Sequence, residues 1–160
     1  SSESFEKKYN SDLANDFGNL VSRVATLINN NFDSKIPIPS TMESDLAKNY
    51  KKIILKDKLD NLEIDKVINS TMTFIRSINV FMEKNEPWKL VKEDKNKAGN
   101  ILFHCAEALR LSSILLSPVM PSKSEDILQI LGTKEKSLVW GKIKPSSSIT
   151  LSKPIFPRIH

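Results

Sequence analysis

The first thirty residues carry the most regular pattern in the chain. Large apolar side chains recur there at intervals of three or four residues, the spacing that places them on one face of an α-helix of about 3.6 residues per turn. They are Phe5, Tyr9, Leu13, Phe17, Leu20, Val21, Val24, Leu27 and Ile28. The pattern predicts one long amphipathic helix of about seven turns.

The remainder of the first 132 residues repeats this pattern between turn and capping signals. The helix is expected to end at residues 29–33, because the prolines at 37 and 39 exclude a helix in the loop that follows. Further helices are predicted from a Ser or Thr cap within 40–44 to about Lys58, at 63–84, in a short turn at 87–93, at 95–116, and at 125–131 after a Ser122 or Ser124 cap. Gly132 is suited to a left-handed C-cap. The sequence therefore predicts an all-α helical bundle of about five helices.

Helical periodicity is lost beyond residue 132. Residues 133–160, the tail, contain three prolines and carry six Lys and Arg against Glu135 alone, whereas residues 1–133 carry 18 basic and 18 acidic side chains. The net charge of +5 therefore resides in the tail. We expect a helical bundle at 1–132 and a basic extended tail at 133–160 that packs on the bundle or on an absent domain. A small hairpin within the tail is one option. Bulk charge alone does not indicate RNA binding.

Composition and chain start indicate an intracellular setting. Apolar residues make up 39% of the chain, which is enough for one core, and the single cysteine, Cys105, can form no internal disulfide. No apolar run approaches the roughly 20 residues of a membrane span. The start lacks the order of a signal peptide and enters a helical pattern at once, as expected of a chain cut between domains. We expect a soluble protein.

A polar ridge lies opposite the apolar face of the first helix. It consists of Asn15, Asn19, Ser22, Arg23, Thr26 and Asn30. Solvated helix faces usually carry Lys and Glu, whereas Asn and Thr are poorer helix formers with directional hydrogen bonds. Gly18 costs a further 1 kcal/mol or so relative to alanine. The ridge indicates either a recognition surface or an ordinary polar surface in an Asn-rich chain.

Trp88 follows a proline that is well placed to start a helix. Lys84, Lys89 and Lys92 surround it, so the ring could serve as a stacking platform for an RNA base. The alternative is that Trp88 closes the end of the bundle as a core residue, which the general burial of tryptophan favours. For Trp140 a structural role in the core is expected still more strongly.

Enzyme chemistry has little support in the sequence. His104 and Cys105 are adjacent on a predicted helix, so their side chains diverge by about 100° and form neither a metal pair nor a nucleophile–base pair. Core packing explains both better. No phosphate-binding glycine loop is present, and the carboxylates alternate with lysines as on solvated helix faces. We predict no catalytic residue and no metal site.

Residues 9–23 resemble the segment that follows the catalytic domain in methionyl-tRNA synthetases. Further similar runs occur in the same order, at 86–90, 107–110, 115–121 and 155–159. The resemblance implies a helical domain that binds the CAU anticodon loop of tRNA(Met). By similarity, Asn19 and Arg23 would hydrogen-bond to the wobble cytosine, Trp88 would stack on it, and Asn15 and Pro87 would support them.

The same resemblance implies what this chain leaves to the rest of the enzyme. The family's ATP- and methionine-binding motifs, and any zinc knuckle, lie upstream of Ser1. We expect a cytoplasmic domain that binds tRNA, without a cofactor of its own and without aminoacylation activity alone. Rival interpretations are the anticodon domain of a related synthetase, a helical protein-interaction module using residues 36–39 or the tail, and, weakest, an independent enzyme.

Overall fold

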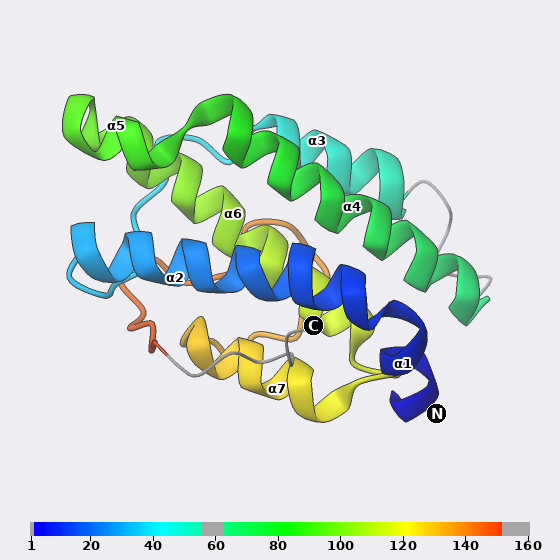
Figure 1. The fold of residues 1–160 in the computed structure, drawn as a ribbon. Coiled ribbons are helices and arrows are strands. Elements are labelled where there is room, and N and C mark those ends of the chain that lie inside the picture. Colours follow the sequence, from blue (N-terminus) through cyan, green and yellow to red (C-terminus); the bar gives the residue numbers. More distant parts are fainter. Residues whose placement is uncertain (1, 56–62, 152–160) are drawn as a thin grey trace.

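The computed structural model describes residues 2–55 and 63–151, and its regular secondary structure within these ranges is helical (Figure 1). The all-α prediction is confirmed. In chain order the elements are α1 (Ser2–Asp12), the π-helical turn η1 (Leu13–Gly18), α2 (Asn19–Asn31), α3 (Asp45–Tyr50), the π-helical turn η2 (Lys51–Leu55), α4 (Ile64–Asn85), α5 (Pro87–Glu93), α6 (Lys95–Leu116) and α7 (Pro121–Ile130). None of these helices is long and apolar enough to cross a membrane.

Helix α6 is the centre of the bundle. It packs against α2, α3, α4, α5 and α7, and Figure 1 shows these helices arranged around it. Its side chains are buried almost continuously from Ala98 to Leu116. The cause lies in the sequence, because most of the side chains from Ala98 to Leu116 are apolar or small on every side of the helix, which favours a place inside the core. His104 and Cys105 are fully buried on this helix, as the core-packing prediction required.

The predicted first helix is continuous but not uniform. Asp12 and Gly18, at the two junctions of η1, both keep right-handed helical angles. The cause of the wider turn is the apolar spacing: Phe5, Tyr9, Leu13 and Phe17 are each four residues apart, and on a regular α-helix such a stripe would drift by about 120°. A π turn holds about one residue more, which cancels about 100° of that drift. It thereby keeps Phe5 buried along with Leu20.

The next helices follow the predictions with few differences. Ser44 caps α3, its Oγ accepting from the Ala47 amide at 3.0 Å, and the predicted end near Lys58 lies outside the described residues. The short helix α5 and helix α6 have the predicted bounds. The apolar side chain of Val80 is 66% exposed, because it stands about 200° around α4 from buried Ile78.

The predicted start and cap of α7 are wrong. The helix begins at Pro121 with Met120 as N-cap, and the Ser124 hydroxyl is buried without a hydrogen bond. Proline favours the first helical position, where its missing N–H costs nothing. The predicted C-cap is confirmed, since Gly132 has φ +67° and the amides of Gly132 and Thr133 donate to Gln129 and Leu128.

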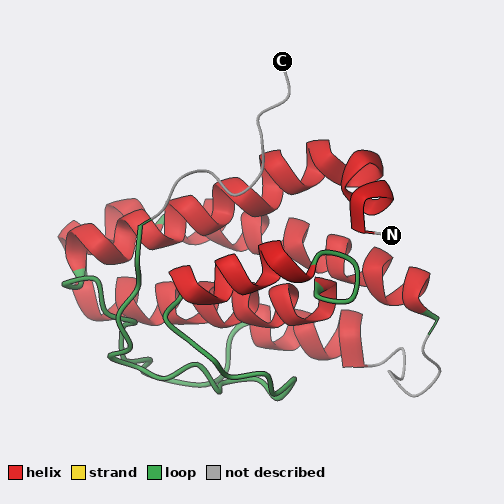
Figure 2. Ribbon diagram, turned by 90° about the horizontal axis from the view of Figure 1, so that it is seen from below, coloured by secondary structure: helices red, strands yellow, loops and turns green. Residues whose placement is uncertain are grey.

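The described part of the tail, residues 133–151, lies along the bundle without helical structure (Figure 2). In place of a hairpin within 133–151, the structure has a single bridge between Ser148 and Lys35 in the loop after α2. Ile149 donates to the Ser34 carbonyl at 2.7 Å, and the Ile143 side chain is buried. The last nine residues, which include Lys153 and Arg158, lie outside the described part.

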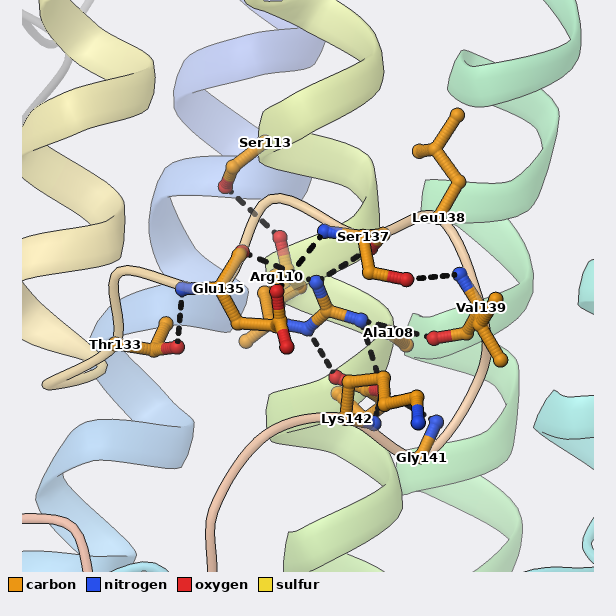
Figure 3. A network of polar contacts seen from close by, with 12 residues as sticks. Ala108, Arg110, Ser113, Thr133, Glu135, Ser137, Leu138, Val139, Gly141 and Lys142 are labelled. Carbon is orange, nitrogen blue, oxygen red and sulfur yellow. Dashed lines mark hydrogen bonds and ion pairs between the residues drawn. The ribbon is translucent and has the colours of Figure 1, made fainter.

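A buried ion pair on α6 holds this part of the tail (Figure 3). Arg110 and Glu107 are both fully buried and contact each other, with Arg110 Nε 2.5 Å from Glu107 Oε1. The guanidinium also donates to the carbonyls of residues 135, 137 and 139, and the carboxylate accepts from the amides of Gly141 and Lys142. For Glu107 the solvated-face interpretation of the sequence is therefore wrong.

Candidate nucleic-acid interface

Arg23 of α2 and Trp88 of α5 meet in an exposed groove. The Arg23 guanidinium carbon lies 5.2 Å from the centroid of the Trp88 ring, within the range of a cation–π contact. Ser22, Thr26 and Leu27 complete the lining of the groove. The fold therefore brings together two predicted site residues that are 65 positions apart in the sequence.

Trp88 is partly buried and partly open to the groove. The ring is partly buried against the hydrophobic core and also lines the groove beside Arg23. Pro87 is buried at the first position of α5, and the preceding residue, Glu86, adopts left-handed angles that end α4 and begin α5. The Glu86 amide donates to the Met82 carbonyl at 2.8 Å. Pro87 thus acts on the site through the backbone, by setting where Trp88 stands.

Glu83 is a neighbour of Arg23 that the sequence analysis did not identify. Its Oε1 lies 3.4 Å from both terminal nitrogens of Arg23, with the two side chains 58% and 39% exposed. Arg23 therefore lies between an aromatic ring and a carboxylate. The one available signal was position, because Glu83 is in the last turn of α4, the helix that leads directly into α5 and Trp88. Its alternation with lysines made it look like any solvated residue.

Asn19 stands one turn before Arg23 on the same helix but does not line the groove. Its side chain is exposed, and its Nδ2 donates to the Asn15 carbonyl at 2.9 Å. The Asn15 side chain is also exposed and reaches only Ser11 Oγ, at 3.4 Å. Ser22, Thr26 and Asn30 are exposed as well. The polar ridge of the sequence is thus a real surface, continuous with the groove at Ser22 and Arg23.

Charges close to this surface are nearly balanced. Lys89 pairs with Glu86 at 2.8 Å, and this hydrogen bond raises the pKa of Lys89. Burial, and secondly the negative charge of Asp12, raises the pKa of Asp16, which lies beside the ridge. No group of three His, Cys, Asp or Glu side chains in the described ranges could hold a metal ion. The surface is suited to hydrogen bonding and stacking more than to strong phosphate attraction.

Comparison with known proteins decides the family. The sequence model of the family described as "Anticodon binding domain of methionyl tRNA ligase" matches residues 37–154. The chain belongs to this family. The match includes Trp88, whereas Asn19 and Arg23 precede it and fall within the alignments to individual relatives, which span 98–99% of the chain.

The relatives are longer proteins. The chain is 31% identical to a methionine–tRNA ligase of Caldanaerobacter subterraneus subsp. tengcongensis and 35% identical to one of Clostridium acetobutylicum, and it spans 27% and 26% of their lengths. Among solved structures, the methionyl-tRNA synthetase of Mycobacterium tuberculosis in complex with methionyl-adenylate superposes with a TM-score of 0.79 at 22% identity. That superposition covers 98% of this chain and 33% of the other. It shows that the two share the fold.

Proposed function

We propose that this domain reads the CAU anticodon of tRNA(Met). The observation that carries the proposal is the Arg23–Trp88 pair: a guanidinium and an aromatic ring 5.2 Å apart in an exposed groove of a domain from this family. Single-stranded RNA is commonly bound by stacking a base on such a ring while side chains read the base edge. A base on Trp88 would take the place that the Arg23 guanidinium has in the free protein.

The available donors and acceptors match cytosine. Arginine has donors only, so Arg23 can donate to the N3 and O2 acceptors of cytosine. The Oδ1 of Asn19 can accept from the cytosine amino group at position 4. Uracil has an oxygen at position 4 and an N–H at position 3, which makes both pairings unfavourable. Glu83 would keep the displaced guanidinium beside the base edge, because its carboxylate already contacts both terminal nitrogens.

The larger protein would be a methionine–tRNA ligase acting in the cytoplasm. The relatives carry that name and are about three to four times as long as the region that this chain matches. Methionine activation with ATP, and any zinc, would belong to the remainder of such a protein. This domain would contribute binding energy that places the acceptor end of the tRNA, and no reacting group.

A second candidate is a helical protein-interaction module without RNA specificity. One observation favours it: Ile38, in the loop between α2 and α3, is 73% exposed. A protein partner bound there would leave the affinity of the domain for RNA independent of the anticodon sequence.

The test is a titration with two anticodon stem-loop hairpins that differ only at the wobble base, cytosine or uracil, at one fixed salt concentration. We expect the cytosine hairpin to bind more tightly by about 1–3 kcal/mol. Trp88→Ala should weaken binding to both hairpins, and Arg23→Ala should remove the preference. Arg76→Ala is the matched control, because Arg76 is an exposed arginine on the neighbouring helix α4 and loses the same charge. Equal binding of both hairpins by the unmodified chain would refute the proposal.

A further inference from the structure

The π turn η1 ends immediately before Asn19. It changes the donors from which the backbone carbonyls of Asn15 and Asp16 accept hydrogen bonds. In a regular α-helix the Asn19 N–H would donate to the carbonyl four residues earlier, at Asn15. Here it donates to the Asp16 carbonyl. The Asn15 carbonyl accepts instead from the side-chain Nδ2 of Asn19, at 2.9 Å.

The same side-chain bond occurs elsewhere in the chain at helix ends. Asn31 Nδ2 donates to Leu27 O at 2.9 Å, and Asn85 Nδ2 donates to Phe81 O at 2.8 Å. Asn31 and Asn85 are the last residues of α2 and α4, and in a regular helix their own backbone N–H groups donate to the same carbonyls. Asn19 makes this bond in the middle of a continuous helix, to a carbonyl from which the π turn has diverted the backbone N–H of Asn19.

We infer that the π turn is a positioning element that fixes the direction of the Asn19 amide. With Nδ2 held by the Asn15 carbonyl, the outward end of the side chain is Oδ1, a pure acceptor. An untethered amide could rotate and offer Nδ2 to the oxygen of uracil as readily as it offers Oδ1 to the amino group of cytosine. Asn15 therefore takes part through its backbone carbonyl. This inference rests on the proposed function, in which Asn19 contacts the wobble base.

The sequence allows the turn to be removed without moving the residues of the site. Deleting Ala14 shortens the Leu13–Phe17 interval from four residues to three, so that the apolar stripe from Phe5 to Ile28 acquires an average spacing of about 3.7, that of an ordinary α-helix. Residues 15–19 stay in sequence. The Asn19 N–H can then donate to the Asn15 carbonyl and displace the side chain from it.

The experiment compares the cytosine and uracil hairpins on the 160-residue chain and on variants of it. The unmodified chain should prefer cytosine by about tenfold or more. Deletion of Ala14 should reduce this ratio to about twofold or less, with binding of the uracil hairpin retained, because the freed amide can pair with either base. Ala14→Ser keeps the length of the turn and should keep the ratio. Circular dichroism and urea unfolding check that each variant is folded.

Rescue separates positioning from damage to the fold. A carboxylate has no donor end, so adding Asn19→Asp to the deletion should restore the preference for cytosine. If the deletion keeps the full ratio, or if Asn19→Asp does not restore a lost one, the inference is wrong while the proposed function stands. If the unmodified chain shows no preference, the proposed function itself has failed.

A second measurement needs no variant. In the free chain, the side-chain amide protons of Asn19 should exchange with solvent more slowly than those of exposed Asn30, because Nδ2 is hydrogen-bonded. Equal exchange by NMR would overturn the inference even if the deletion variant did not fold.

Discussion

Arg110 uses its complete set of hydrogen-bond donors in the interior. It makes two bonds to the Glu107 carboxylate and three to carbonyls of the tail, which accounts for all five donors of a guanidinium. Because both charges are fully buried, each would be strongly destabilising without the other. The pair therefore couples the stability of α6 to the position of residues 135–142.

Replacing Arg110 with lysine should destabilise the chain by about 3–5 kcal/mol. Lysine keeps the charge but has three donors at a single point, so it cannot reach both carboxylate oxygens and three carbonyls. Urea unfolding followed by circular dichroism measures the loss. The control is Arg76→Lys on the exposed face of α4, which should change the free energy of unfolding by no more than about 0.5 kcal/mol. A loss below about 1 kcal/mol at Arg110 would show that the pair is not what holds the tail.

The candidate site residues stand out in the sequence because their chemistry is unusual for their place. An asparagine-rich helix face and a tryptophan after a helix-starting proline stood out, and the fold brings Arg23 and Trp88 together. The sequence did not distinguish Glu83 and Glu107 from ordinary solvated carboxylates in the same way. A carboxylate among lysines has the same local pattern whether it is solvated, pairs across helices or is buried, because the partner that decides is supplied by tertiary structure.

Element boundaries were predicted best where proline, glycine or a capping side chain interrupts the helical pattern. Glu86, Pro87 and Asp94 delimit α5 and α6 as expected. The π turn was not predicted, because intervals of four residues fit a helical template as well as intervals of three do. Only their accumulation from Phe5 to Phe17 shows that the turn must widen. The predicted start of α7 was wrong because it relied on a serine cap at 122 or 124, whereas Pro121 occupies the first helical position.

The N-terminal end of helix α3 is hydrogen-bonded to a buried histidine of α6. His104 Nε2 lies 2.8 Å from the Thr41 carbonyl and must donate to it, and in the neutral ring Nδ1 then accepts from the Ser44 hydroxyl, also at 2.8 Å. Ser44 in turn caps α3 by accepting from Ala47. Burial of the ring favours its neutral form. Burial lowers the pKa of His104 below 6.5, although the Thr41 carbonyl and the charge of Glu107 oppose the shift.

The stability of the chain should therefore fall on mild acidification. With the folded pKa of His104 below the unfolded value, the unfolded chain binds more protons, and stability is lost as pH falls through 6.5 toward the folded pKa. We expect the free energy of unfolding to decrease between about pH 7.5 and 5.5. In His104→Gln, measured by urea unfolding at each pH, this decrease should be smaller. Parallel curves for the two proteins would mean that His104 is protonated equally in both states.

Across the whole molecule, charge is divided unequally between the bundle and the tail. Residues 1–133 are balanced, and the excess of +5 lies beyond them. In the described part of the tail, Lys136 pairs with Glu125 on α7, while Lys142 and Lys144 are exposed. The Arg23–Trp88 groove therefore belongs to the neutral part of the chain, and an RNA bound there would meet few positive charges.

This distribution predicts a weak dependence of hairpin binding on salt. Each phosphate contact to single-stranded RNA contributes about −0.7 to the slope of log K against log salt concentration, so about two or three contacts near the groove give a slope of about −2. Exchanging Lys142 and Lys144 together for glutamine should leave that slope unchanged, because these lysines stand outside the groove. Titrations of the cytosine hairpin at about 50 and 200 mM salt measure it. A slope steeper than about −4 that is reduced in the double variant would mean that the tail holds the RNA backbone while the groove reads the base.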